Sequence, residues 1–169
     1  MNYKICYVLF FMLTLVLQGK AQDHDWAFGF YGDVQMKSPY PGAFGIQGKY
    51  DFLTRSAVQA QVYGKSGYVA VGADYLVSFL DKTKSNFNVF LGGGISQDFY
   101  RYNELWSGDA ESIPTERENF TILNGQAGIS YYFPAVNVSV YTGYKLKYNI
   151  DWEETAPDYI MFGVRYHLW

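Results

Sequence analysis

The side chains that most often carry catalysis are scarce in this sequence. His24 and His167 are the two histidines, and Cys6 is the single cysteine. A serine hydrolase needs a serine nucleophile, a histidine base and an acidic side chain that orients the histidine, but no serine follows either histidine two positions later. Two histidines are also few for a metal site. We therefore predict no catalytic site, no cofactor and no metal, and interpret His167 as a packing residue.

Two acidic segments that contain tryptophan are better candidates for binding. Residues 100–118 include Trp106 and Glu111, and residues 149–157 include Trp152 and Glu153. Clustered carboxylates could hold a divalent cation, and an exposed tryptophan could hold a sugar or a protein partner. The spacing matches no calcium-binding motif. We interpret both segments as solvated loops, and these four residues as candidate contacts with an extracellular ligand that the sequence does not identify.

The first 21 residues have the composition of a secretory signal peptide. Lys4 supplies a positive charge, residues 8–17 form a short apolar run, and small residues precede Gln22. We predict cleavage before Gln22 and one domain over residues 22–169. Without Lys4 and Lys20 this domain has 11 basic and 16 acidic residues, a net charge of −5. It has no basic patch, which argues against nucleic acid as a partner.

The elements that would position these residues are β-strands. Aromatic residues make up 20% of the chain and charged residues only 17%, with 17 tyrosines and 17 glycines, a composition that favours β-structure. Apolar residues recur at every second position in eight stretches separated by turn residues, as expected of strands with one apolar face. These stretches are residues 26–36, 44–52, 58–62, 69–79, 87–99, 123–133, 138–148 and 160–168. We predict an all-β, eight-stranded antiparallel up-and-down barrel whose last strand closes on the first.

The charged residues of the predicted strands all avoid the apolar face. They are Asp33, Lys49, Asp51, Asp74, Asp98, Lys145, Lys147 and Arg165. A basic residue facing lipid would cost about 2–4 kcal/mol at the membrane midplane, so this pattern predicts apolar side chains outside and a charge network inside a narrow lumen. A soluble exported barrel of the lipocalin type would have the reverse arrangement. The balance of four acids and four bases, and the aromatic residues near strand ends, favour the membrane barrel.

The predicted lumen is filled rather than open. A barrel of eight strands encloses a space that side chains occupy, and on this register Tyr31, Tyr63, Tyr132 and Tyr141 point inward. The run 92–94 is three consecutive glycines. No helix is expected after the run, so it is not a phosphate-binding loop. We expect it to allow close packing of a lumen side chain.

These features resemble the small outer-membrane β-barrel proteins of Gram-negative bacteria, the group that includes OmpX, the OmpA barrel domain and the opacity-type porin-family proteins. The resemblance covers residues 26–169. It implies a location in the outer membrane, lipid as a partner, and recognition of Val164, Tyr166 and Leu168 in the last strand by the barrel-assembly machinery, with Trp169 one residue beyond the usual end. We expect a monomer with a structural or surface-interaction role. An outer-membrane barrel enzyme acting on lipid A, as a deacylase or acyltransferase, is the main alternative.

Overall fold

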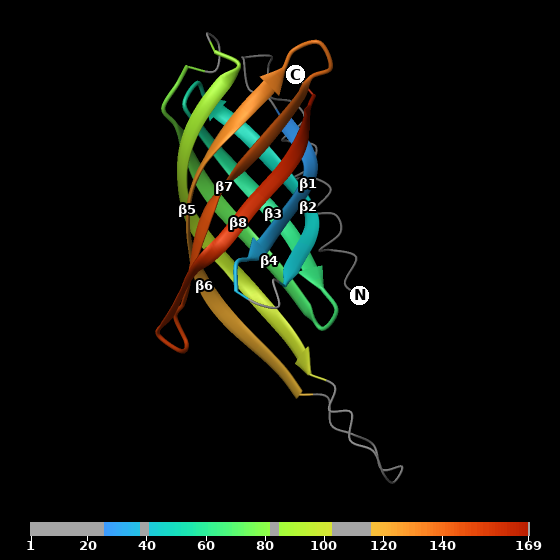
Figure 1. Cartoon of the computed structure of the whole chain (residues 1–169), viewed down its shortest axis with the longest axis vertical. Coiled ribbons are helices and arrows are strands. Elements are labelled where there is room, and N and C mark those ends of the chain that lie inside the picture. Colours follow the sequence, from blue (N-terminus) through green and yellow to red (C-terminus); the bar gives the residue numbers. More distant parts are fainter. Residues whose placement is uncertain (1–25, 38–40, 82–84, 103–115, 169) are drawn as a thin grey trace, which may run out of the picture.

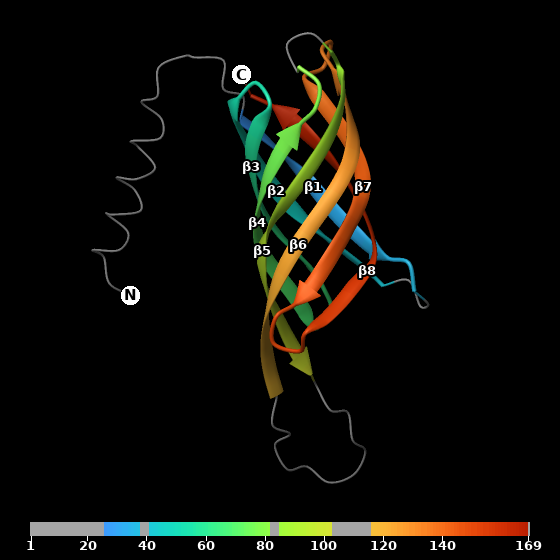
Figure 2. The ribbon, with the colours of Figure 1, turned by 90° about the vertical axis from the view of Figure 1, so that its left-hand side faces the viewer.

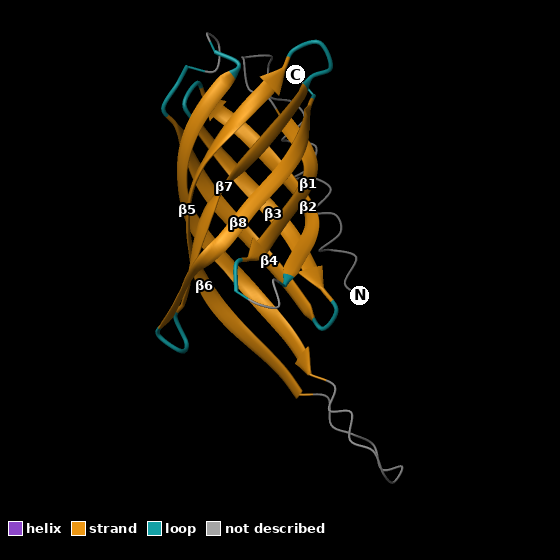
Figure 3. Cartoon of the chain, in the orientation of Figure 1, coloured by secondary structure: helices purple, strands orange, loops and turns teal. Residues whose placement is uncertain are grey.

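All regular structure in the described part of the chain is β-strand. The computed structural model describes residues 26–37, 41–81, 85–102 and 116–168. The eight strands are β1 (Trp26–Gln35), β2 (Gly42–Leu53), β3 (Ser56–Lys65), β4 (Tyr68–Ser78), β5 (Phe87–Tyr102), β6 (Glu116–Phe133), β7 (Val138–Asn149) and β8 (Glu154–His167). They form one closed barrel (Figure 1, Figure 3). Within the described ranges, no helix is long and apolar enough to cross a membrane.

The barrel closes because its first and last strands pair. Each strand is antiparallel to the next along the chain, and β1 pairs with β8 from Ala27 opposite His167 to Gln35 opposite Tyr159. No sheet edge is therefore left open around the barrel itself. The predicted fold class is confirmed.

The alternation of side chains along each strand decides which face lies inside. In β1, Phe28 and Phe30 are 49% and 73% exposed on the outer surface, whereas Ala27, which precedes them, and Tyr31, which follows them, are buried. The other strands repeat this pattern, and β4 alternates over its whole length. The described part of the barrel thus has an apolar exterior and a polar interior.

The connections between strands lie at the two ends of the barrel, which we call the terminal end and the hairpin end. The terminal end contains Trp26, Leu168 and the connections 54–55, 79–86 and 134–137; the hairpin end contains the other four connections. Figure 2 shows the β5–β6 ribbon projecting beyond the rest of the barrel at the hairpin end. The lengths of the connections do not divide simply between the two ends, because β4–β5 at the terminal end spans eight residues and β7–β8 at the hairpin end spans four.

The predicted loop over residues 100–118 is wrong at both ends. β5 continues to Tyr102 and β6 begins at Glu116, with Arg101 paired to Arg117. The Arg101 amide also donates to the Gly67 carbonyl in the β3–β4 turn, at 2.9 Å. Here backbone hydrogen bonds between β5 and β6 extend beyond the last alternating apolar residues. A prediction based on apolar alternation therefore ends both strands too early.

The predicted loop over residues 149–157 is also too long. β8 begins at Glu154, so the turn is residues 150–153, and the Asn149 side chain accepts hydrogen bonds from the amides of Asp151 and Trp152 at 2.9 and 3.2 Å. Pro157 lies within β8 despite lacking an amide hydrogen. It fits because the β7–β8 register shifts between Lys145 and Lys147, and bulges tolerate proline.

Candidate functional site in the barrel interior

All eight charged residues predicted for the lumen lie inside the barrel. Their exposed fractions range from 0% for Lys145 to 8% for Asp51. The set is Asp33 on β1, Lys49 and Asp51 on β2, Asp74 on β4, Asp98 on β5, Lys145 and Lys147 on β7, and Arg165 on β8. Six strands therefore contribute charge to one enclosed space, where each ion needs a partner to offset its desolvation.

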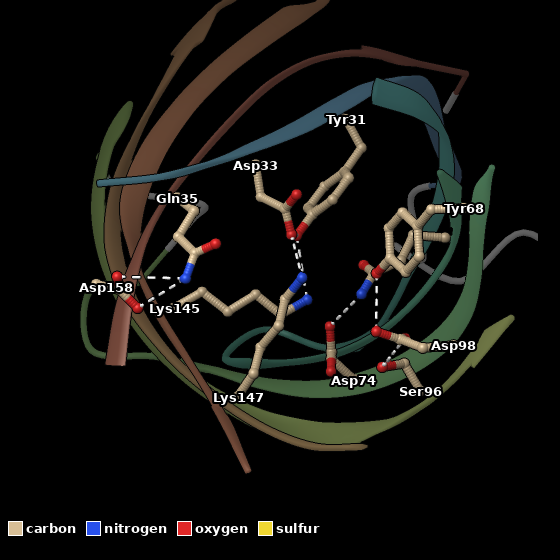
Figure 4. A network of polar contacts seen from close by, with 11 residues as sticks. Tyr31, Asp33, Gln35, Tyr68, Asp74, Ser96, Asp98, Lys145, Lys147 and Asp158 are labelled. Carbon is tan, nitrogen blue, oxygen red and sulfur yellow. Dashed lines mark hydrogen bonds and ion pairs between the residues drawn. The ribbon is translucent and has the colours of Figure 1, made fainter. Parts of the chain in front are cut away.

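Figure 4 shows Lys145 and Lys147 pointing towards Tyr31 and Asp33 in the middle of the interior. Lys147 Nζ is 2.8 Å from Asp33 Oδ2, and the Tyr31 hydroxyl donates to the same oxygen at 3.4 Å. Lys145 Nζ donates to the Tyr31 hydroxyl at 3.1 Å. Both lysines also lie over the Tyr63 ring, at 5.5 Å for Lys145 and 5.1 Å for Lys147. Lys147 thus has an anionic partner, whereas Lys145 is held by a phenol and by aromatic faces.

Arg165 is held by neutral groups. Its Nε donates to Gln47 Oε1 at 3.1 Å, its Nη2 donates to Gln59 Oε1, and its guanidinium carbon lies 3.9 Å from the centre of the Tyr141 ring. No carboxylate among the described residues forms an ion pair with it, while Lys49 pairs with Asp51. The interior is therefore ionic in places and amide-based in others, rather than one network of salt bridges.

The remaining acids are also held by neutral donors. Gln61 donates to Asp74 Oδ2 at 2.8 Å, and Tyr68 donates to Asp98 Oδ2 at the same distance. The Asp74 carboxylate lies against Gly94, where a Cβ would overlap it and the carbonyl of Ala73. The glycine run thus allows close approach of a lumen carboxylate.

A series of aromatic rings leads from the interior to the surface at the hairpin end. Centroid distances are 6.3 Å from Tyr63 to Tyr68, 4.8 Å on to Tyr100, 5.7 Å on to Phe120 and 4.4 Å on to Trp152. We call these five residues the aromatic series. Phe120 is 7% exposed and Trp152 is 56% exposed. Sequence reasoning missed Tyr68, although the alternation of β4 placed it on the inner face.

The other predicted surface contacts are placed only in part. Glu153 is exposed in the β7–β8 turn, with φ at +55°. Trp106 and Glu111 lie outside the described residues, as do His24, residues 1–21 and Trp169. The structure therefore brings Trp152 and Glu153 to the hairpin end.

The terminal end contains a serine–histidine contact that the sequence search did not find. His167 Nε2 lies 2.8 Å from Ser139 Oγ, and the Tyr132 ring packs edge-on against the imidazole at 5.0 Å. The two residues are 28 positions apart and come from neighbouring strands, so no local motif could reveal them. They line a pocket of about 110 Å³. Among the described residues, no group of three or more His, Cys, Asp or Glu side chains could hold a metal ion.

A closed eight-stranded barrel with an apolar exterior and a charged interior has the architecture of small outer-membrane barrels. The sequence matches no protein-family model and no curated protein. Solved structures with the same architecture include the N-terminal barrel domain of Pseudomonas aeruginosa OprF, with a TM-score of 0.65, 15% identity, and coverage of 87% of this chain and 98% of that one.

Two further proteins give the same result at similar identity. For Neisserial surface protein A (NspA) the TM-score is 0.55 at 18% identity, covering 86% of this chain and 97% of that one. For Yersinia pestis Ail in complex with the heparin analogue sucrose octasulfate, the TM-score is 0.52 at 14% identity, with 86% and 97% covered. These likenesses establish the fold: the chain is a small eight-stranded barrel of the outer-membrane type.

Proposed function

We propose that this protein is a non-enzymatic barrel of the Gram-negative outer membrane, with its terminal end towards the periplasm. The observation that carries the proposal is the apolar exterior. Phe44, Ile46 and Phe30 are 59%, 63% and 73% exposed, and exposed apolar side chains recur on all eight strands. In water a continuous apolar surface of this extent is strongly unfavourable, and lipid removes the penalty. A soluble lipocalin-like barrel would have the inverse arrangement.

The position of aromatic residues supports the same membrane assignment. Trp26 stacks on Tyr50 with a centroid distance of 4.6 Å, and Tyr131 packs against Phe133 at 4.7 Å. Both pairs lie towards the terminal end of the exterior. Aromatic side chains with polar tips favour the boundary between lipid and water, so we assign this level to the periplasmic interface.

The first experiment tests membrane insertion and sidedness of the strands. Membrane fractionation should recover the protein in the detergent-extracted outer membrane, with heat-modifiable migration on a gel. A cysteine introduced at Tyr144, which is 50% exposed, should react with a lipid-phase reagent, whereas one at Lys145, which is 0% exposed, should not. Recovery in the soluble fraction, or the opposite labelling pattern, would refute the assignment.

We propose further that the lumen does not conduct larger solutes. Support comes from the side chains that occupy it: Tyr31 and Tyr63 are each 2% exposed, Tyr141 is 5% exposed, and the Asp33–Lys147 ion pair crosses the interior. Reconstituted vesicles should not swell in an isotonic sugar solution. Swelling equal to that of a general porin would contradict a filled lumen.

The hairpin end is the surface we propose for interaction with an extracellular partner. Trp152 is exposed yet supported from below by Phe120, so the indole is presented rigidly. The described carboxylates of Asp151, Glu153 and Glu154 are exposed there. An exposed acidic surface repels polyanions and attracts cations. We therefore expect a basic or neutral partner, in contrast to Ail, which was solved with a sulfated heparin analogue.

The charge of the hairpin end gives a direct test of this partner class. Proteoliposomes should bind an oligolysine probe in a salt-dependent manner and should not bind sucrose octasulfate. Replacing Glu153 and Glu154 by lysine should weaken oligolysine binding, while Lys65→Gln serves as a control that leaves these carboxylates unchanged. Binding of the octasulfate, or oligolysine binding that is indifferent to the Glu153 and Glu154 changes, would refute the proposed preference.

The remaining assignments extend the same proposal. Outer-membrane lipid would surround the apolar exterior. The barrel-assembly machinery would recognise the C-terminal segment through Val164, Tyr166 and Leu168, which are exposed. We propose a monomer. The alternative enzyme of lipid A is disfavoured because Ser139 and His167 face the interior rather than the lipid. Mass spectrometry of lipid A with and without the protein should detect no difference.

A further inference from the structure

The terminal end of the interior contains a small pocket that the proposed function does not use. It has a volume of about 110 Å³, and its polar lining includes Ser78, Asn88, Ser139, Arg165 and His167. Liquid water occupies about 30 Å³ per molecule, so the pocket has room for three to four waters or for one small polyatomic ion.

Several of the residues that line the pocket are small. Ser78, Ser130 and Ser139 are among them, and Ser78 is 3% exposed. Deeper in the barrel, the inward positions hold Tyr31 and Tyr63, which fill the interior. The serines leave space at the terminal end that the larger lining side chains do not fill.

The charge lining this space is not balanced. Arg165 is 4% exposed, and its guanidinium donates to the neutral amides of Gln47 and Gln59. Lys49 and Asp51, which also line the pocket, form an ion pair with each other. The pocket therefore carries an excess positive charge from Arg165. The Asp51 carboxylate thus faces two buried cations, Lys49 and Arg165. Buried charges need partners of opposite sign, and an anion bound beside Arg165 would balance the second cation.

We propose that this pocket binds a small oxyanion, that is, a phosphate or carboxylate group, with the Arg165 guanidinium as its charged receptor. A planar guanidinium presents its N–H groups in a fork that matches two oxygens of a carboxylate or phosphate. The Ser139 hydroxyl and the His167 imidazole lie 2.8 Å apart on the same wall. When the imidazole donates to Ser139 Oγ, the Ser139 O–H is left as a neutral donor to the anion. Leu76 and Phe90, 3% and 4% exposed, provide an apolar floor.

Other ligand classes fit the pocket poorly. Arg165 repels metal cations, and a volume of about 110 Å³ is below the 300 Å³ or more of usual organic ligand sites. The second buried cation without an ion pair, Lys145, is 0% exposed and does not line this pocket. Lys145 is therefore a matched control for Arg165: it is also a buried interior cation, but it is not at the site.

The test uses the full barrel, refolded in an uncharged maltoside detergent, so its outcome does not depend on the membrane orientation proposed above. Inorganic phosphate and acetate are titrated separately, and binding is followed by calorimetry and by the NMR shift of the His167 imidazole. Saturable binding with a His167 shift is expected. Arg165→Gln should weaken it about tenfold or more, as for loss of a charge-assisted hydrogen bond, and Lys145→Met should not.

A second variant keeps the proposal testable if Arg165→Gln fails to fold, as judged by heat-modifiable migration. Ser139→Leu fills the pocket from its wall and should abolish the saturable shift. A short-chain phosphatidic acid in the same detergent distinguishes a lipid headgroup from a free anion. Preferential binding of either form supports the proposed oxyanion site and shows whether its ligand is a lipid headgroup or a free anion. Absence of saturable binding by every probe, or equal weakening by Arg165→Gln and Lys145→Met, would overturn the proposal.

Discussion

Removing one member of the Asp33–Lys147 pair should strongly destabilise the barrel. The carboxylate and the ammonium lie 2.8 Å apart, and their side chains are 2% and 8% exposed. Asp33→Asn preserves the size of the side chain and an oxygen that can accept from the Tyr31 hydroxyl. The change therefore removes the charge with little disturbance of packing.

The expected cost follows from the environment of Lys147. At an effective dielectric constant of about 20, two unit charges 2.8 Å apart attract by about 6 kcal/mol before desolvation is counted. Lys147 would keep its contact with the Tyr159 ring, at 4.1 Å, which offsets about 2 kcal/mol. We expect Asp33→Asn to lower the free energy of unfolding by about 3–5 kcal/mol, as for other broken buried pairs.

A double-mutant cycle measures the pair itself. Adding Lys147→Met to Asp33→Asn removes both charges, and this variant should be within about 2 kcal/mol of the wild type because no lone ion is left buried. The assay is urea unfolding in lipid vesicles, followed by tryptophan fluorescence and gel mobility. The control is the pair of exposed Lys37 and half-buried Asp158, 3.8 Å apart; Lys37→Gln should change stability by less than about 1 kcal/mol. Additive effects in the cycle would refute this reasoning.

Three other substitutions have distinct expected outcomes. Tyr144→Arg places a charge on the lipid-facing side near the middle of β7 and should cost about 2–4 kcal/mol in vesicles, whereas Tyr144→Phe should be nearly neutral; equal effects would contradict lipid exposure. Gly94→Ala should destabilise by about 1–3 kcal/mol because its Cβ overlaps the Asp74 side chain and the neighbouring backbone. The control Gly125→Ala meets no atom within 4 Å and should be tolerated, so a similar cost for both would refute the packing argument. Asp151→Ala removes the acceptor of the Thr121 amide, 2.9 Å away, and should accelerate hydrogen exchange at that amide while leaving the urea midpoint unchanged.

The sequence predicts much of the fold because alternation is a local property. A strand has a period of two, and one face of a barrel strand is always inside. Phe28 and Phe30 could therefore be placed on the opposite face to Ala27 and Tyr31 without coordinates. The same argument fails where apolar and polar residues do not alternate, as in the projecting part of β5 and β6. It fails again at Pro157, where a bulge allows the strand to continue.

The interior contacts could not be predicted in the same way. Knowing that Lys145, Lys147 and Arg165 point inward does not say which group each one meets, because facing positions depend on the stagger of strands around the closed barrel. Arg165 reaches Gln47, 118 positions away, and Lys145 reaches Tyr31, 114 positions away. In the part of the interior that the structure describes, the expected salt-bridge network includes the ion pairs Lys49–Asp51 and Asp33–Lys147, while amides and phenols hold Asp74, Asp98, Lys145 and Arg165.

The sequence by itself thus determined the number of strands, their inner and outer faces and the residues that carry charge, since each of these is encoded within a few consecutive positions. Tertiary structure alone decided which charges pair, that Ser139 meets His167, and that Arg165 lies beside a pocket whose one carboxylate, Asp51, is paired with Lys49. The physical reason is closure of the barrel. Pairing β1 with β8 fixes the stagger of all eight strands, and that stagger selects which distant side chains meet inside.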